Sequence, residues 1–385
     1  MIKLAENIIS WCAAPEPGAV LQAENLSKHP CLIGNVCLMP DTHEGYGMPI
    51  GGVVALDNAV CPNMVGVDIG CGMLAVSTSI TERPDRETLC KIMGKIRETV
   101  PVGFNHQKEP QDDPIFEDPL WREVPSVCFS ECESAKRQLG TLGGGNHFIE
   151  LQWGGDGHMW FMIHSGSRNL GKKVADHYNK IAIDLCTMWR QTDCVKNELA
   201  FLPRGCKEHD DYLQEMVLCV QFGLANRRHM SAAIMAAISG VLPDTRFEEP
   251  INIIHNYAVL EHHYGRDVVV HRKGATLARK GTIGIIPGSQ GSRSYIVRGL
   301  GNETSLCSCS HGAGRKMSRK KAREELKLDD EIAKMNELGI VHGIRTAADL
   351  DEAPSAYKDI DTVMSEQRDL VEILTQLTPI AVIKG

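Results

Sequence analysis

The chain has 385 residues, 43% hydrophobic and 23% charged, which is typical of a globular protein with a large core. A formal net charge of -8 argues against a protein that coats nucleic acid through bulk positive charge, although a local basic surface can still bind phosphates. Residues 1–14 lack the pattern of a signal peptide, and no segment has the roughly 18 uninterrupted apolar residues of a membrane span. We therefore expect a cytoplasmic protein with no membrane contact.

Short β-rich runs alternate with helical patterns along the chain. We predict strands over 35–39, 51–56, 73–78, 158–163, 267–271 and 294–297. An apolar stripe from Leu213 to Leu224 predicts a buried helix over 212–224, and the patterns of 318–338 and 355–377 also indicate helices. Acidic residues and prolines predict a surface loop over 107–125. Without a strict βαβ rhythm or a clear boundary, we predict an α+β fold in a single domain over 1–385.

Residues 66–72 (GVDIGCG) place a carboxylate, Asp68, three positions before a thiol, Cys71. Both groups bind metals, and the glycines around them let the backbone bend tightly. His147, His164 and His255 each follow or open an apolar run, where a strand end can carry them into a pocket. Each could instead be a buried core residue, but three in similar surroundings favour a metal site. Such a set can hold two divalent ions if Cys71 bridges them, and ligand softness favours zinc or iron over manganese.

His311 lies in residues 308–315 (SCSHGAGR), where small neighbours leave the imidazole accessible. Backbone amides and Arg315 can hold phosphate oxygens there, so the histidine suits nucleophilic attack on phosphorus. The alternative is a structural histidine in a tight turn. Arg315 and Arg319 flank this segment and are predicted to be functional, whereas the lysines that follow fit a solvated helix face. Residues 287–292 (PGSQGS) fit either a phosphate- or base-binding loop or a plain turn.

Two familiar sites are excluded by their missing residues. Residues 166–173 (GSRNLGKK) approach a phosphate-binding loop but lack its final hydroxyl, and no dinucleotide-binding glycine motif follows a strand. Fourteen cysteines include no C-x-x-C pair, which argues against a zinc ribbon or a thioredoxin-type site.

Together these segments closely resemble the RtcB family of RNA-splicing ligases. Further matching segments are 39–47 (MPDTHEGYG), 142–150 (LGGGNHFIE), 163–168 (IHSGSR) and 382–385 (VIKG), so the resemblance spans the whole chain in order. It implies an RtcB-like ligase that uses GTP and two Mn²⁺ ions to join an RNA 3′-phosphate or 2′,3′-cyclic phosphate to an RNA 5′-hydroxyl. We therefore expect manganese because of this resemblance, although the softness of the ligands alone favours zinc or iron. A small activating partner of the archease type is compatible with the family.

The resemblance also implies residue roles. Cys71 would bridge two ions, one held with Asp68 and His147 and the other with His164 and His255. His311 would be the nucleophile that becomes guanylylated, with Asp41 as an acid near the reacting centre. The residues implied in nucleotide binding are Asn146, Phe148, Glu150, Ser289, Gly312, Ala313, Gly314, Tyr357 and Lys384. Those implied in RNA-phosphate contacts are Arg168, Asn256, Arg315 and Arg319.

Two rival functions remain open. One is a metal-dependent 2′,3′-cyclic phosphodiesterase that lacks ligation, and the other is a non-catalytic RNA sensor. His311, Lys384 and the nucleotide-binding loop argue against the phosphodiesterase, because hydrolysis needs no guanylylated histidine. The complete ligand set argues against the sensor, because a binding module gains little from two metal ions and a nucleophile.

Overall fold

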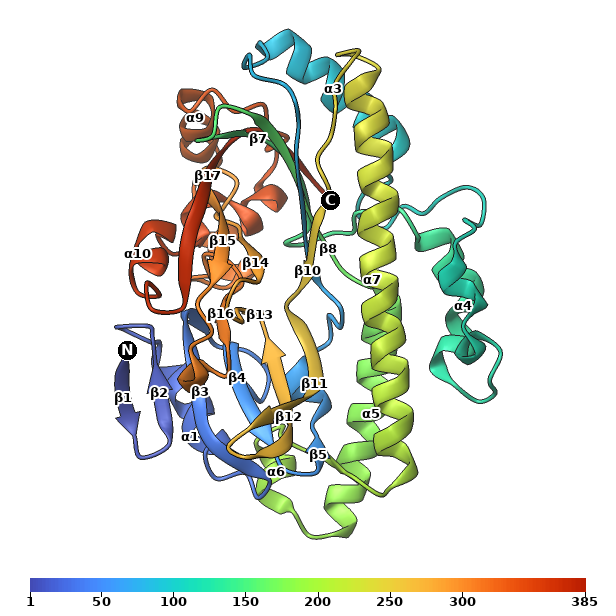
Figure 1. The fold of residues 1–385 in the computed structure, drawn as a ribbon, viewed down its shortest axis with the longest axis vertical. Helices are drawn as coiled ribbons and strands as arrows, with labels where there is room; N and C mark the ends of the chain where they lie inside the picture. The colour runs from blue at the N-terminus through green and yellow to red at the C-terminus, as the bar shows by residue number, and fades with distance from the viewer.

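A computed structural model describes residues 1–385 and contains two large β-sheets beside a long helix (Figure 1). The six-stranded sheet has, in spatial order, β1 (Ile2–Ala5), β2 (Ile8–Ser10), β3 (Leu32–His43), β4 (Ile50–Leu56), β12 (Arg266–Lys273) and β11 (Asn256–His263). The seven-stranded sheet has β10 (Ile251–Ile254), β6 (Gly72–Ser77), β8 (Met159–Ser165), β7 (Phe148–Gly154), β17 (Val371–Lys384), β15 (Ser294–Gly299) and β14 (Ile283–Ile286).

Smaller elements complete the fold. Two-stranded ladders join β13 (Ala275–Leu277) to β16 (Ser308–Ser310) and β5 (Ala59–Val60) to β9 (Leu202–Pro203). The α-helices are α1 (Pro17–Leu26), α2 (Pro62–Val65), α3 (Arg86–Thr99), α4 (Val127–Gln138), α5 (Arg168–Met188), α6 (Thr192–Lys196), α7 (Lys207–Ser239), α8 (Arg319–Glu325), α9 (Leu328–Glu337) and α10 (Ile360–Ser365). Short 3₁₀ turns are η1 (Pro114–Glu117), η2 (Pro119–Trp121), η3 (Glu303–Ser305), η4 (Ala347–Glu352) and η5 (Pro354–Ala356).

The topology confirms the α+β class. Among the paired strands only β2 and β3 run parallel, and all other strand pairs are antiparallel. Helices therefore do not alternate with strands as crossovers, as they would in a doubly wound fold. All six predicted strands are present, most with boundaries extended by one or a few residues. The single-domain organisation stays a prediction.

The predicted helix over 212–224 lies within the N-terminal part of α7, which runs along one side of the molecule (Figure 1). The predicted buried face was partly wrong, because Val217 is 47% exposed. The buried face instead includes Glu215, Cys219 and Asn226. Because polar and small residues lie on this face, the stripe of apolar residues in the sequence does not coincide with the surface that packs against the protein.

Two helix predictions near the end of the chain need correction. The segment 318–338 forms two helices, because the backbone is extended at Leu326 and Lys327 between α8 and α9. The segment 355–377 was wrong as one helix: it holds the short α10 and then enters β17. That strand pairs with both β7 and β15, and pairing on both edges outweighs local helix preference.

The segment 107–125 is mostly an exposed loop, as predicted, but it is anchored in the core. Trp121 is 2% exposed, donates a hydrogen bond to the carbonyl of Ile115 at 2.8 Å, and packs edge-on against Phe222 of α7. The ring therefore fixes η1 and η2 against the long helix.

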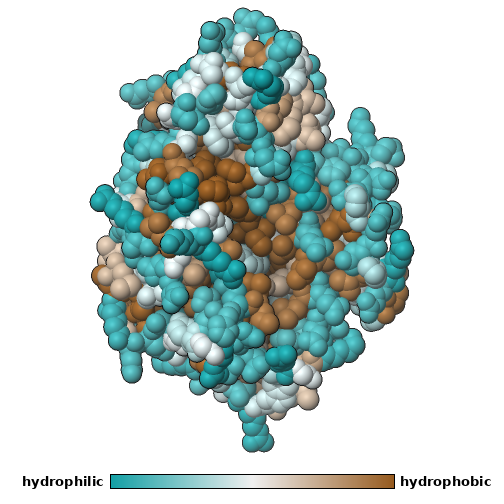
Figure 2. All heavy atoms as spheres, in the orientation of Figure 1, coloured by the Kyte–Doolittle hydropathy of each residue, from teal (hydrophilic) through white to brown (hydrophobic).

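Among the helices, none combines the length and the apolar character needed to cross a bilayer. On the face drawn in Figure 2, hydrophobic residues gather along the middle of the molecule while hydrophilic residues cover most of the periphery.

Candidate active site

The five side chains predicted to bind metal come together at one end of the seven-stranded sheet. Strands β10, β6, β8 and β7 are adjacent and antiparallel, so the ends of β10 and β8 lie beside the starts of β6 and β7. His255 follows β10, Cys71 precedes β6, His164 is near the end of β8, and His147 precedes β7. Asp68 lies in the turn before Cys71. Strand pairing thus gathers ligands from distant parts of the chain.

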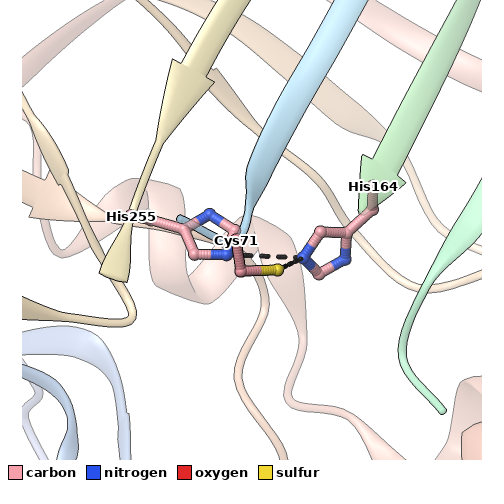
Figure 3. A group of neighbouring side chains, drawn as sticks. All are labelled: Cys71, His164 and His255. Carbon is pink, nitrogen blue, oxygen red and sulfur yellow. Dashed lines mark hydrogen bonds between the residues drawn. The ribbon is translucent and has the colours of Figure 1, made fainter. Parts of the chain in front are cut away.

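The ligand atoms form two groups that share one thiol. Cys71 Sγ lies 3.2 Å from His164 Nε2, and His164 Nε2 lies 3.4 Å from His255 Nε2. Figure 3 draws these two contacts as dashed lines. On the other side Cys71 Sγ lies 3.5 Å from His147 Nε2, which lies 3.4 Å from Asp68 Oδ2. In each group of three the ligand atoms lie within 4.8 Å of one another. The two groups contain the same residues as the two predicted ligand sets, and their metal-binding role stays a prediction.

The protonation states of these groups fit a divalent cation. Burial lowers the pKa values of His164 and His255 well below the ordinary histidine value, so both imidazoles are neutral with a free lone pair. Burial raises the pKa of Asp68, but its hydrogen bond to His147 and the charge of that ring outweigh burial and hold the pKa at about 2. Burial and Asp68 raise the pKa of the Cys71 thiol well above its usual range, so the thiolate needs a cation beside it.

A buried pair on α7 holds the loops that carry these ligands, and the sequence patterns did not indicate it. The Arg227 guanidinium donates to the carbonyls of Gly70 at 3.1 Å, Ser165 at 2.6 Å and Ile253 at 3.2 Å. Each carbonyl lies within two residues of a predicted metal ligand. Asn226 adds contacts to the backbone of residues 140, 141 and 166. The sequence signal that could have identified this pair is the presence of two adjacent polar residues, Asn226 and Arg227, on the buried face of a helix.

His311 lies directly after β16, and its ring faces the metal-ligand cluster. Its ring centroid is 4.8 Å from that of His255. Asp41 Oδ2, fully buried on β3, lies 2.7 Å from His311 Nδ1 and accepts the backbone N–H groups of His311 and Gly312 at 3.1 and 3.3 Å. Burial raises the Asp41 pKa, but the charge and hydrogen bond of His311 outweigh burial and lower it. An ionised Asp41 accepts from Nδ1–H, which leaves the lone pair of a neutral imidazole on Nε2.

The backbone after His311 packs closely on the same strand. Gly314 has a φ of +71°, and a Cβ there would lie 2.2 Å from the carbonyl oxygen of Asp41. Only glycine fits this approach without displacing β3. The glycines of the segment therefore place His311 against the Asp41 carboxylate as well as leaving its ring accessible.

A cavity of about 720 Å³ opens over His311 and His164. Eight of the predicted nucleotide-binding residues line it: Asn146, Phe148, Ser289, Gly312, Ala313, Gly314, Tyr357 and Lys384. Lys384 Nζ lies 5.7 Å from the ring centroid of Phe148. The predicted phosphate contacts Arg315 and Arg319 also line the cavity. Positive charge and an aromatic face thus meet beside the histidine.

Glu352, which sequence reasoning missed, connects these cations. Its side chain is 3% exposed, and its carboxylate lies 3.1 Å from Arg315, 2.8 Å from Arg319 and 4.0 Å from Lys384. It also accepts a hydrogen bond from the Tyr357 hydroxyl. Burial raises the Glu352 pKa, but these cations outweigh burial and lower it. Glu352 is the last residue of η4, a 3₁₀ turn too short to give a periodic signal.

Three predicted binding residues lie outside the cavity lining. Glu150 is 2% exposed, and burial raises its pKa to about 8. Asn256 donates to the carbonyl of Asp68 at 3.1 Å and accepts the N–H of Gly274 at 2.7 Å, so its amide braces the backbone of the site. Arg168 is partly buried and donates to Thr141 and to the carbonyl at residue 103. Their roles toward nucleotide or RNA stay predictions.

Known proteins match this chain along nearly its whole length. The family model for the tRNA-splicing ligase RtcB matches residues 22–128 and 122–385. The RNA-splicing ligase RtcB of Escherichia coli is 38% identical over 394 residues, covering 96% of this chain and 95% of that protein. The tRNA-splicing ligase RtcB of Nanoarchaeum equitans is 31% identical over 446 residues, covering 96% and 92%. The predicted resemblance is therefore confirmed, and the chain belongs to the RtcB family.

Proposed function

We propose that the protein is a cytoplasmic RNA ligase that joins a 3′-phosphate or 2′,3′-cyclic phosphate end to a 5′-hydroxyl end, using GTP and two Mn²⁺ ions. The position of His311 supports this function most strongly. Its imidazole is held by Asp41, its ring centroid lies 4.8 Å from that of His255, and it lines the same cavity as the predicted nucleotide-binding residues.

The chain's own residues support a covalent route. His311 Nε2 would attack the α-phosphorus of GTP, forming a P–N bond as pyrophosphate leaves. The RNA 3′-phosphate would then attack the same phosphorus, so the P–N bond breaks and the 3′ end carries GMP. Attack of the 5′-hydroxyl on the 3′-phosphorus forms the new phosphodiester and releases GMP. A cyclic phosphate is first opened by water. Asp41 would keep the Nδ1 proton in place throughout.

Two divalent ions fit the ligand groups described above. One would be held by Cys71, His164 and His255 and the other by Asp68, Cys71 and His147. When bound, they supply positive charge that stabilises phosphate oxygens during transfer. The identity of the ions as manganese rests on the family resemblance.

The cavity residues divide between nucleotide and RNA in this proposal. Phe148, Ser289 and Lys384 would hold the nucleotide, and Arg315 and Arg319 would contact RNA phosphates. The donors of a guanidinium match the paired oxygens of a phosphate. A small activator of the archease type stays a prediction about partners.

A ligation assay tests the proposal. Labelled RNA with one 3′-phosphate end and one 5′-hydroxyl end is incubated with GTP and Mn²⁺, and joined product is resolved on a denaturing gel. Wild-type protein should give GTP-dependent product, His311→Ala should give none, and the exposed control His177→Ala should match wild type. Cyclic-phosphate opening that persists without any GTP-dependent joining would favour the 2′,3′-cyclic phosphodiesterase instead.

A further inference from the structure

Tyr46 presents an exposed aromatic ring to the cavity. It lies in the turn between β3 and β4, lines the cavity with His311, and is 71% exposed. Its hydroxyl makes no hydrogen bond within the protein, and its ring has no aromatic partner. The fold therefore gains little from an aromatic side chain at this position.

The backbone under Tyr46 is nevertheless held firmly. The Lys273 ammonium, on a residue only 7% exposed, donates to the Tyr46 carbonyl at 2.6 Å. Gln22 both donates to and accepts from the backbone of the preceding residue, at 2.6 and 3.1 Å. Glu198 accepts the N–H of the following residue at 3.0 Å. Three side chains from separate elements thus fix the turn while the ring stays free, as a preorganised binding group requires.

Negative charge beside Tyr46 favours the approach of an uncharged base over that of a phosphate. Glu44 and Glu16 line the cavity on this side. The Glu44 carboxylate lies against the first turn of α1, since a Cβ added at Gly18 would be 2.4 Å from Glu44 Oε2. Glu16 is the residue directly before this helix, so the two carboxylates are on the same side of the cavity. Three cations of the cavity, Arg315, Arg319 and Lys384, cluster around Glu352 instead. Phosphates are repelled from the acidic side, whereas an uncharged base can approach the ring.

We propose that the ring of Tyr46 is a stacking platform for an RNA base next to the reacting end. The proposal rests on the proposed RNA-joining function and deepens it, because it assigns a base-binding subsite to the acidic side of the cavity. Stacking on an aromatic face suits a ligase that accepts ends of varied sequence, since every base has a π-face.

Three variants separate an aromatic platform from a simple apolar contact. Tyr46→Phe keeps the ring, Tyr46→Leu keeps apolar volume without a π-face, and Tyr46→Ala removes both. We expect Ala and Leu to raise the KM for RNA roughly 5- to 100-fold, the range for loss of one stacked base, and Phe to stay near wild type. Guanylylation by GTP without RNA should be unchanged in all three. Equal KM values for wild type and Tyr46→Ala would overturn the proposal.

Base analogues identify the stacked position. RNA carrying 2-aminopurine at the 3′-terminal or 5′-terminal nucleotide should lose fluorescence on binding wild type or Tyr46→Phe, but not Tyr46→Ala, at one of the two ends. An abasic nucleotide at that end should erase the KM difference between wild type and Tyr46→Ala. A difference that survives abasic substitution at both ends would contradict base stacking. A wild-type protein that neither becomes guanylylated nor joins RNA would overturn the ligase function itself, which is a distinct result.

Discussion

Asp41 Oδ2 lies 2.7 Å from His311 Nδ1, and the same oxygen accepts the backbone N–H of His311 at 3.1 Å. One carboxylate therefore fixes both the orientation of the ring and the backbone that carries it. Because the carboxylate accepts from Nδ1–H, Nε2 is left to react. This relationship makes Asp41 a positioning residue for the proposed nucleophile.

Asp41→Asn tests that role. An amide can offer its NH₂ group to the ring and stabilise the unreactive tautomer, as happens when the aspartate of a catalytic triad is changed to asparagine. We expect guanylylation to fall roughly 100- to 10,000-fold with little change in melting temperature. The rate is measured by single-turnover labelling with GTP. A guanylylation rate close to that of wild type would show that Asp41 does not set the tautomer.

Metal stoichiometry tests the sharing of Cys71. Since this thiol belongs to both ligand groups, Cys71→Ala should weaken the binding of both ions, whereas His255→Ala should weaken the binding of only one. Calorimetric titration with Mn²⁺ measures the number and affinity of sites. Cys90→Ala, at an exposed cysteine on α3, is the matched control. Two intact sites in Cys71→Ala would rule out a shared thiolate.

Arg227→Lys tests the buried brace behind the metal site. Lysine cannot reach three separate carbonyls, and each buried carbonyl left unpaired costs about 1–3 kcal/mol. We expect the free energy of unfolding to fall by roughly 2–4 kcal/mol and Mn²⁺ affinity to fall about 10- to 100-fold. Chemical denaturation and metal titration measure the two effects. The neighbouring Arg228 is exposed, so Arg228→Lys should change neither. Unchanged metal affinity in Arg227→Lys would contradict the claim that Arg227 holds the metal-ligand loops in place.

Glu150 should make stability depend on pH. Its pKa is about 8 in the folded protein and 4.5 for an ordinary glutamate, so between these values the folded state holds a proton that the unfolded chain releases. Wild-type stability should therefore fall, relative to Glu150→Gln, as pH rises from about 5 to about 8, by at most about 1.4 kcal/mol per pH unit. Denaturation of both proteins without metal or nucleotide measures the difference. A difference that does not change with pH would place the carboxyl in a more polar environment.

The sequence predicted which side chains come together in the candidate site better than it predicted the path of the chain. Asp68, Cys71 and the three histidines were recognisable because glycine-rich segments carry ligand types of fixed chemistry. Residues 371–377 at the start of β17 were predicted as helix, because the pairing of this strand with β7 and β15, which no local pattern reveals, decides its conformation. Glu352 and Arg227 were missed for a similar reason: each acts through contacts with residues far away in the chain.

The most direct test of the central claim is covalent labelling of His311. The protein is incubated with α-labelled GTP and Mn²⁺, quenched, digested and mapped by mass spectrometry. We expect an acid-labile GMP adduct on His311 that is lost in His311→Ala and retained in His177→Ala. An absence of adduct in wild type with Mn²⁺ and with other divalent ions, or an adduct on a different residue, would contradict the proposed nucleophile.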